Sequence, residues 1–183
     1  WSAADLIVGA PHVEGSDESA VFHNSAFYLT PEGGLRDRYD KVHLLPFAEY
    51  FPLRFVELLR RNFERVRYFT PGAERTLLDT RWGPTAVVIC FEAIFPEIVR
   101  AQMAAGAVLL VNLSNDVWLG RGIGQRQHLA MVVLRAVENR TWIVRSTTTG
   151  VSALIDPYGR VTSEGPLFEK AVLQGAVVPM RVD

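Results

Sequence analysis

The only cysteine of the chain, Cys90, stands where the apolar run Ala86–Ile89 gives way to Phe91 and Glu92. In α/β proteins the end of a buried strand is where ligands usually bind. A thiol placed there is exposed as a nucleophile, and the backbone N–H of Phe91 can donate to an oxyanion. Free cysteines are also among the most buried residue types, so an inert core thiol is the alternative. Position alone does not decide between the two.

A lysine, a histidine and a glutamate stand among aromatic residues and prolines in the segment 39–53, YDKVHLLPFAEYFPL. The ammonium of Lys41 is a compact charge with three donors, so it can stabilise an anionic intermediate. The apolar arm His43–Leu53 can form a lid that admits lipid chains. The alternative is a loop that covers the core with its aromatic residues while Lys41 points to water.

Polar residues also follow a second apolar run, in the segment 112–120, NLSNDVWLG. Asn, Ser and Asp commonly satisfy turn backbone and cap the next element. At a second strand end they can equally build a wall of the same pocket. On the helix that follows, three residues at spacings of seven and three share one face, and we expect a buried structural ion pair among them: His128, Arg135 and Glu138.

Short apolar runs that alternate with helical patterns predict an α/β fold with buried strands. We expect strands at Leu6–Ala10, Phe22–Leu29, Thr85–Cys90, Ala107–Leu113, Thr141–Arg145, Val151–Ile155 and Ala171–Val178. Helices are expected at Phe95–Ala105, Gln127–Asn139 and Arg54–Phe63. Turns at 30–34 and 156–159 suggest hairpins, the second leading into a further short strand.

Composition limits the classes of protein to consider. The 183 residues, 49% of them hydrophobic, fit one globular domain over residues 1–183. A net charge of −1 gives no basic excess for nucleic acid, and a single cysteine gives neither an internal disulfide nor a zinc site. The longest apolar stretch, Met103–Val111, is too short to span a bilayer. Because residue 1 is Trp rather than Met, we expect the chain to belong to a longer polypeptide.

The three segments, in this order, resemble the nitrilase (carbon–nitrogen hydrolase) superfamily, and within it the apolipoprotein N-acyltransferase branch. The resemblance rests on YDKVHLLPFAEY at 39–50, ICFE at 89–92, and SNDVWLG at 114–120 with Gln127-His128. Further matches are RAVEN at 135–139, Arg145, GVSA at 150–153 and DPYG at 156–159. The order and spacing hold over nearly the whole chain.

The resemblance implies an αββα sandwich and a Glu-Lys-Cys triad. It makes Cys90 the nucleophile, Lys41 the transition-state stabiliser, Glu49 the carboxylate that holds the lysine, and Glu92 a supporting residue. The triad's general-base Glu has no match, so we expect it upstream, together with the sandwich's N-terminal strands. Substrate contacts are expected from Phe91, Asn115, Trp118, His43 and Phe47, with no metal and no cofactor.

The activity implied is transfer of a fatty acyl chain from a phospholipid, through a cysteine thioester, to the N-terminal amine of a diacylglyceryl-cysteine lipoprotein. The partners are then a phospholipid donor, a lipoprotein acceptor and a membrane reached through a missing N-terminal region. The place is the bacterial inner membrane, with this domain on the extracytoplasmic side. Two alternatives stay open: a soluble amidase or nitrilase acting on a small amide or nitrile, and a non-catalytic remnant that binds lipid or a partner.

Overall fold

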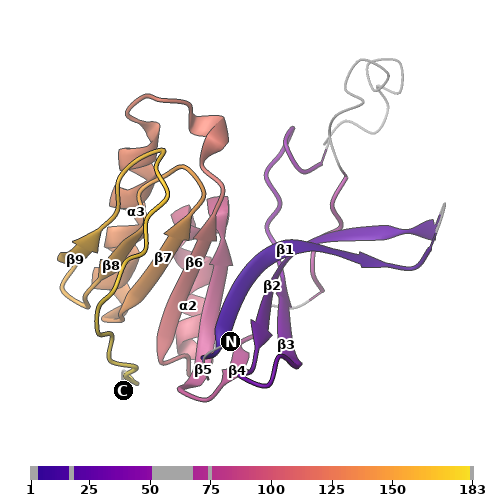
Figure 1. Ribbon diagram of the computed structural model, residues 1–183, viewed down its shortest axis with the longest axis horizontal. Coiled ribbons are helices and arrows are strands. Elements are labelled where there is room, and N and C mark those ends of the chain that lie inside the picture. Colours follow the sequence, from indigo (N-terminus) through magenta and orange to yellow (C-terminus); the bar gives the residue numbers. More distant parts are fainter. Residues whose placement is uncertain (1–3, 17–18, 51–67, 74–75, 182–183) are drawn as a thin grey trace.

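The computed structural model describes residues 4–16, 19–50, 68–73 and 76–181, which build two β-sheets and two α-helices (Figure 1). The smaller sheet is antiparallel, with the strand order β1-β2-β3. Its strands are β1 (Leu6–Glu14), β2 (Val21–Leu29) and β3 (Leu35–Asp40). The turn at Gly33, which has a φ of 79°, joins β2 to β3 as the Pro and Gly residues there predict.

The larger sheet has six strands in sequence order, β4 to β9. They are β4 (Leu78–Thr80), β5 (Gly83–Ile89), β6 (Leu109–Ser114), β7 (Ile143–Thr147), β8 (Ala153–Ile155) and β9 (Val161–Glu164). The three central strands, β5 to β7, run parallel, and the outer ones pair antiparallel. Their carboxyl ends therefore meet at one edge of the sheet, which is where ligands bind in α/β folds.

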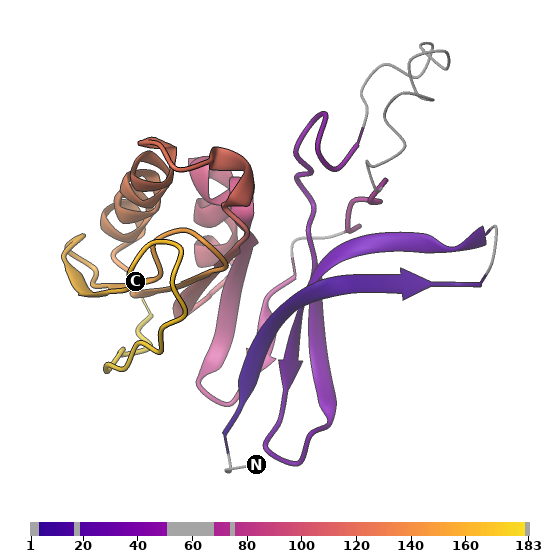
Figure 2. The ribbon, with the colours of Figure 1, turned by 45° about the horizontal axis from the view of Figure 1, so that its top comes forward.

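Helices connect the parallel strands, as parallel pairing requires. Between β5 and β6 the chain forms the 3₁₀ helix η3 (Cys90–Ile94) and α2 (Pro96–Ala104), which begins with a proline at its first turn. Between β6 and β7 it forms η4 (Val117–Leu119) and α3 (Gly124–Asn139). Both α-helices lie on the same face of the six-stranded sheet (Figures 1 and 2).

Alternate residues of the central strands fill two separate cores, because successive side chains of a strand point to opposite faces. Ala86, Val88 and Leu110 pack with α2 and α3 on the helix side. On the other side the core joins the two sheets, and it includes Ala26, Tyr28, Tyr39, Val87, Ile89, Leu109 and Val111. The described chain therefore has three layers, which are the helices, the larger sheet and the smaller sheet, and the two sheets share one core (Figure 2).

The two-sheet α/β fold agrees with the expectation from the sequence. Six of the expected strands and the helices at 95–105 and 127–139 are present, although α3 begins three residues earlier, and β9 is the further short strand. The strand expected at Ala171–Val178 is wrong, because no ladder forms there and Val172 and Val178 stay exposed. Apolar β-branched residues make a strand only where a neighbouring strand pairs with them. The helix expected at Arg54–Phe63 lies outside the described residues.

Candidate active site

Cys90 lies at the point where β5 turns into η3, at the carboxyl edge of the sheet. Its φ is 53°, in the left-handed region that a residue other than glycine rarely occupies. Such strain is held in place by surrounding contacts and clusters at functional sites. The expectation of an exposed thiol is wrong, because Cys90 is only 9% exposed. Its Sγ nevertheless lines a pocket and lies 4.0 Å from the carbonyl oxygen of Asn115.

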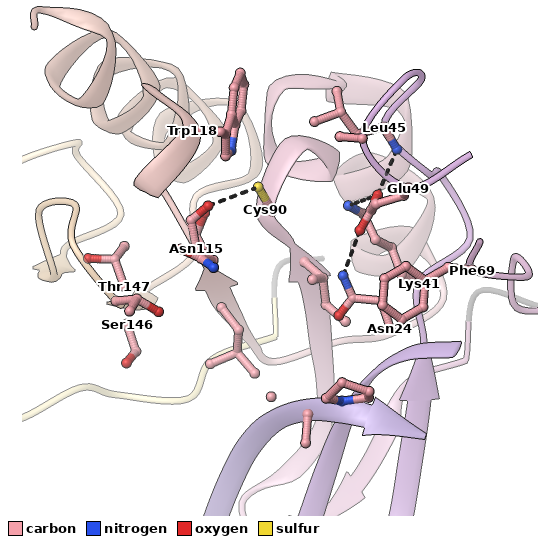
Figure 3. A pocket seen from close by; sticks show the side chains of 18 residues that line it. Asn24, Lys41, Leu45, Glu49, Phe69, Cys90, Asn115, Trp118, Ser146 and Thr147 are labelled. Carbon is pink, nitrogen blue, oxygen red and sulfur yellow. Dashed lines mark hydrogen bonds and ion pairs between the residues drawn. The ribbon is translucent and has the colours of Figure 1, made fainter. Parts of the chain in front are cut away.

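This pocket, hereafter the Cys90 pocket, has a volume of about 550 Å³ and lies between the smaller sheet and the carboxyl ends of the parallel strands (Figure 3). One wall comes from β1, β2 and the segment after β3, and the other from the ends of β5, β6 and β7. The lining residues are Gly9, Ala10, Pro11, Asn24, Lys41, Leu45, Ala48, Glu49, Phe69, Ile89, Cys90, Leu113, Ser114, Asn115, Trp118, Ser146, Thr147 and Thr148.

Lys41 follows β3 and is 1% exposed, so its ammonium is fixed rather than solvated. Its Nζ donates to Glu49 Oε2 at 2.6 Å. The same carboxylate accepts from the backbone N–H of Leu45 at 2.7 Å and, through Oε1, from Asn24 Nδ2 at 2.6 Å. Lys41 and Glu49 face Cys90 from the opposite wall of the pocket (Figure 3). The structure thus brings the expected nucleophile, lysine and carboxylate to one cavity.

Glu92 is fully buried but does not line the Cys90 pocket. Its Oε1 accepts from Tyr39 Oη and from the backbone N–H groups of Val42 and His43, each at 2.9 Å. Its Oε2 accepts from the N–H of Ile89 at 2.8 Å. Burial raises the pKa of Glu92, against the opposing effect of these hydrogen bonds and of Lys41. Glu92 therefore ties the lysine segment to the strand end that carries the thiol.

The residues expected to contact substrate fall into two groups. Asn115 and Trp118 line the Cys90 pocket, and Trp118 is 50% exposed at its mouth. Phe91 and His43 instead pack against Phe95, with ring centroids 5.2 Å and 4.5 Å away. His43 borders a separate cavity of about 310 Å³ with Val42, Leu44, Tyr50, Phe69 and Pro71.

Phe47 is also outside the lining of the Cys90 pocket. It is 62% exposed and has a φ of 65°. Leu45, two residues earlier in the expected lid, does line the pocket, whereas Leu44 is buried. The last residues of the expected lid, 51–53, lie outside the described residues.

Sequence reasoning missed two parts of the site. Asn24, which anchors Glu49, stands in the middle of β2 with no neighbouring motif to mark it. The expected ion pair on α3 is wrong for His128, which lies 3.0 Å from Asp116 of the β6–α3 loop. Asp116 also pairs with Arg145 of β7, at 2.6 Å. The other pair of α3, between Arg135 and Glu138, does form, at 2.9 Å, but it is not buried, because the Glu138 side chain is 44% exposed.

Burial and the neighbouring charges act in opposite directions on the pKa values of Asp116 and Arg145. Burial acts to raise the pKa of Asp116, but the hydrogen bond from His128 and the charge of Arg145 outweigh it and leave the pKa lowered. Burial lowers the pKa of Arg145, and Asp116 opposes that change. The carboxylate and the guanidinium thus stabilise each other inside the protein.

The profile of the carbon-nitrogen hydrolase family matches residues 5–183. The chain belongs to this family. It is 44% identical to an apolipoprotein N-acyltransferase of Geobacter metallireducens over 93% of this chain and 33% of that protein. It is 41% identical to one of Pseudomonas putida over 96% of this chain and 35% of that protein. The chain thus spans about a third of the length of the curated relatives it matches.

Solved structures of the family share the fold. Saccharomyces cerevisiae Nit3, a member of branch 10 of the nitrilase superfamily, superposes with a TM-score of 0.65 and 24% identity, covering 90% of this chain and 57% of that one. A carbon-nitrogen hydrolase from Helicobacter pylori superposes with a TM-score of 0.67 and 17% identity, covering 90% of this chain and 60% of that one. Neither α2 nor α3, the α-helices of the described chain, has the length and apolar character of a bilayer-spanning helix.

Proposed function

We propose that this chain is the catalytic domain of an apolipoprotein N-acyltransferase. The single observation that carries the proposal is the meeting of Cys90, Lys41 and Glu49 around one pocket in a chain 44% identical to a relative of that name. The complete protein would move a fatty acyl chain from a phospholipid to the N-terminal amine of a diacylglyceryl-cysteine lipoprotein. We place it at the bacterial inner membrane, with this domain on the extracytoplasmic side.

In the first half of the reaction, Cys90 Sγ attacks the ester carbonyl carbon of the phospholipid. A C–S bond forms, and the carbonyl π electrons move to oxygen as an oxyanion. The general-base Glu, which we expect upstream of this chain, takes the thiol proton. When the oxyanion collapses, the C–O bond breaks and that proton passes to the leaving alkoxide. The products are a lysophospholipid and an acyl thioester on Cys90.

In the second half, the α-amine of the lipoprotein attacks the thioester carbon. A second oxyanion forms and collapses, which breaks the C–S bond and leaves an amide. The amine loses one proton to the base, and the base returns it to the departing sulfur. Cys90 is regenerated as a thiol, so the cycle is closed.

Lys41 is suited to stabilise both oxyanions. Its ammonium is held by Glu49 at 2.6 Å and shielded from water, so it needs no reorganisation when charge develops. The backbone N–H of Phe91, directly after the nucleophile, is the second donor. Glu49 is a positioning residue in this scheme, because it orients the lysine without touching the substrate.

The walls of the pocket suit an acyl chain. Leu45, Phe69, Leu113 and Trp118 supply apolar surface to the pocket that holds the thiol. Trp118 is half exposed at the mouth, and Phe47 projects from the facing segment. Exposed apolar groups beside a pocket commonly mark a lipid or ligand contact.

The test is to trap the acyl-enzyme. The full-length protein is incubated with a phospholipid that carries an isotope-labelled acyl chain, and its peptides are analysed by mass spectrometry. We expect the label on the peptide that contains Cys90, released by hydroxylamine as a thioester. Cys90→Ala should carry no label, and Cys90→Ser should hold it as a hydroxylamine-resistant ester.

Four outcomes would overturn the proposal. Label on another residue, or acyl transfer that persists in Cys90→Ala, would remove Cys90 from the reaction. No label from phospholipid together with ammonia release from a small amide would instead identify a soluble amidase. Lipid binding with neither reaction would identify a non-catalytic lipid-binding domain.

A further inference from the structure

A buried ion cluster lies behind the wall of the pocket that carries Cys90, at the carboxyl ends of β6 and β7. Arg145 Nη2 lies 2.6 Å from Asp116 Oδ2, and His128 Nδ1 lies 3.0 Å from Asp116 Oδ1. Ser114 Oγ also donates to Asp116 Oδ1, at 2.6 Å. Buried ion pairs are often no more stabilising than apolar residues of the same volume. Stability alone is therefore a weak reason for this cluster.

Arg145 is linked to the strand that carries the thiol. Its Nη1 donates to Asn112 Oδ1 on the neighbouring strand β6. Asn112 Nδ2 in turn donates to the carbonyl oxygen of Val88 at 3.1 Å. Val88 lies two residues before Cys90, so the guanidinium helps to fix the end of β5.

Arg145 is also linked to the opposite side of the thiol. It holds the side chain of Asp116, and the preceding residue is Asn115. The carbonyl oxygen of Asn115 is the atom that faces Cys90 Sγ at 4.0 Å. One guanidinium thus connects the strand before the nucleophile with the carbonyl in front of it.

The loop between β7 and β8 closes over the ion pair. Arg145 Nε donates to the carbonyl oxygen of Val151 at 3.1 Å. A Cβ atom on Gly150 would lie 2.1 Å from Asp116 Oδ2, so only glycine allows this approach. These contacts therefore restrict the Asp116 carboxylate and the Arg145 guanidinium to a single arrangement.

His128 contacts both members of the ion pair. Its Nδ1 lies 3.0 Å from Asp116 Oδ1 and 3.3 Å from Arg145 Nη2. The His128 side chain is 5% exposed, and among the described residues its buried Nε2 has no hydrogen-bond partner.

Arg145 places a positive charge behind the thiol. Burial lowers the pKa of Arg145, and the charges of Asp116 and Cys90 oppose that change. The other ionisable groups packed around Cys90 are Lys41 and Glu49 across the pocket, Glu92 on η3, and Asp116 and His128 behind the wall.

We propose that Arg145 is a positioning residue for Cys90: it fixes the strand end and the Asn115 carbonyl around the thiol and places a positive charge behind the sulfur. The inference rests on the proposed role of Cys90 as the nucleophile. Asp116 sets the size of this effect, because it neutralises part of the charge. Lys41 then acts on the oxyanion from the pocket side, while Arg145 acts on the sulfur from behind.

The test is the pH dependence of Cys90 alkylation by iodoacetamide in the full-length protein, followed on the Cys90 peptide by mass spectrometry. Arg145→Met should raise the pH midpoint, since removal of a nearby positive charge disfavours the thiolate. Asp116→Asn should lower the midpoint, because it leaves the guanidinium charge uncompensated. Arg145→Lys should return the midpoint toward that of the unaltered protein.

Arg135→Met is the matched control. Arg135 is also a largely buried arginine, and it donates to the carbonyl oxygen of Ile94 at 3.2 Å and to Glu138 at 2.9 Å. Its loss should lower the melting temperature without moving the alkylation midpoint. The opposite shifts expected from Arg145→Met and Asp116→Asn are a pattern that a merely structural role does not produce.

An unchanged midpoint in folded Arg145→Met, or shifts in the same direction for the two variants, would overturn the inference. If Arg145→Met does not fold, Asp116→Asn decides: a lowered midpoint supports the inference, and an unchanged or raised one contradicts it. Alkylation needs no acyl donor. The alkylation experiment therefore tests the role of Arg145 even in a protein that gives no acyl-enzyme. A negative result in one experiment does not imply a negative result in the other.

Discussion

Lys41 and Glu49 form an ion pair, with Nζ and Oε2 2.6 Å apart and the two side chains 1% and 12% exposed. Two charges at this depth are stable only because each satisfies the other and because Asn24 and Leu45 donate to the same carboxylate. The pair spans eight residues of irregular chain. It therefore holds the segment after β3 in the one shape that points Lys41 at the Cys90 pocket.

Glu49→Gln should damage both stability and activity. The amide leaves the ammonium of Lys41 buried without a counter-charge, and breaking a buried pair in this way costs about 3 kcal/mol. The melting temperature should fall, and kcat should drop more than KM rises, because the oxyanion donor is misplaced. Glu138→Gln is the control: its partner Arg135 is buried, but the Glu138 side chain is 44% exposed, so little should change. An active, fully stable Glu49→Gln protein would contradict the prediction.

Lys41→Ala should lower kcat/KM on the phospholipid by about 10²-fold or more, the scale of losing one oxyanion donor. The loss should appear in kcat, because the role proposed for Lys41 is to stabilise the transition state. Steady-state kinetics with a soluble short-chain ester separates the two constants. A change confined to KM would assign Lys41 to substrate binding instead.

The sequence predicted the pocket but not the charges behind it. Cys90 and the 112–120 segment both follow buried parallel strands, and parallel strands bring their carboxyl ends to one edge. Asp116, which follows β6, pairs with Arg145 of β7, and the two residues are 29 positions apart in the chain. No local sequence pattern predicts such a pair. The same holds for Asn24, whose partner Glu49 is 25 positions away.

Strand β3 shows why local pattern fails elsewhere. Its sequence, LRDRYD, is too charged to predict a strand. In the structure, Arg38 pairs with Glu14 at 2.8 Å and with Asp40 at 3.0 Å, so these charges are satisfied across and along the sheet. Tertiary pairing thus overrides the intrinsic preference of the segment.

Gly150→Ala should destabilise the protein, although the substitution is small. The new methyl group would overlap Asp116 Oδ2 at 2.1 Å, and overpacking of a fixed group costs about 1–3 kcal/mol. Gly122→Ala is the control, because a Cβ there meets nothing within 4 Å. Urea unfolding of both variants measures the difference. Equal stability would show that the buried carboxylate can move aside.

Asp116 should make the protein acid-sensitive. Its pKa is lowered in the folded state from the ordinary 3.8, so the folded state binds the proton less tightly than the unfolded state. The stabilisation is therefore complete above about pH 3.8 and is lost as pH falls through the lower, folded-state value. The difference in unfolding free energy between the unaltered protein and Asp116→Asn should become smaller as the pH drops below 3.8. A gap that stays constant in urea unfolding between pH 3 and pH 6 would contradict this.

Phe47→Ser should reduce activity on lipid without unfolding the protein. Phe47 is 62% exposed, and it lies on the segment whose Leu45 and Ala48 line the Cys90 pocket. Its replacement therefore removes little buried apolar surface and should leave the melting temperature nearly unchanged. Turnover of long-chain phospholipid in micelles should fall, while that of a soluble short-chain ester should not, because only the long chain needs an apolar contact at the mouth. Hydrogen exchange should slow across residues 43–50 when lipid is added. A Phe47→Ser protein that melts, or a segment fully protected before lipid is present, would show that these residues are core and not a lid.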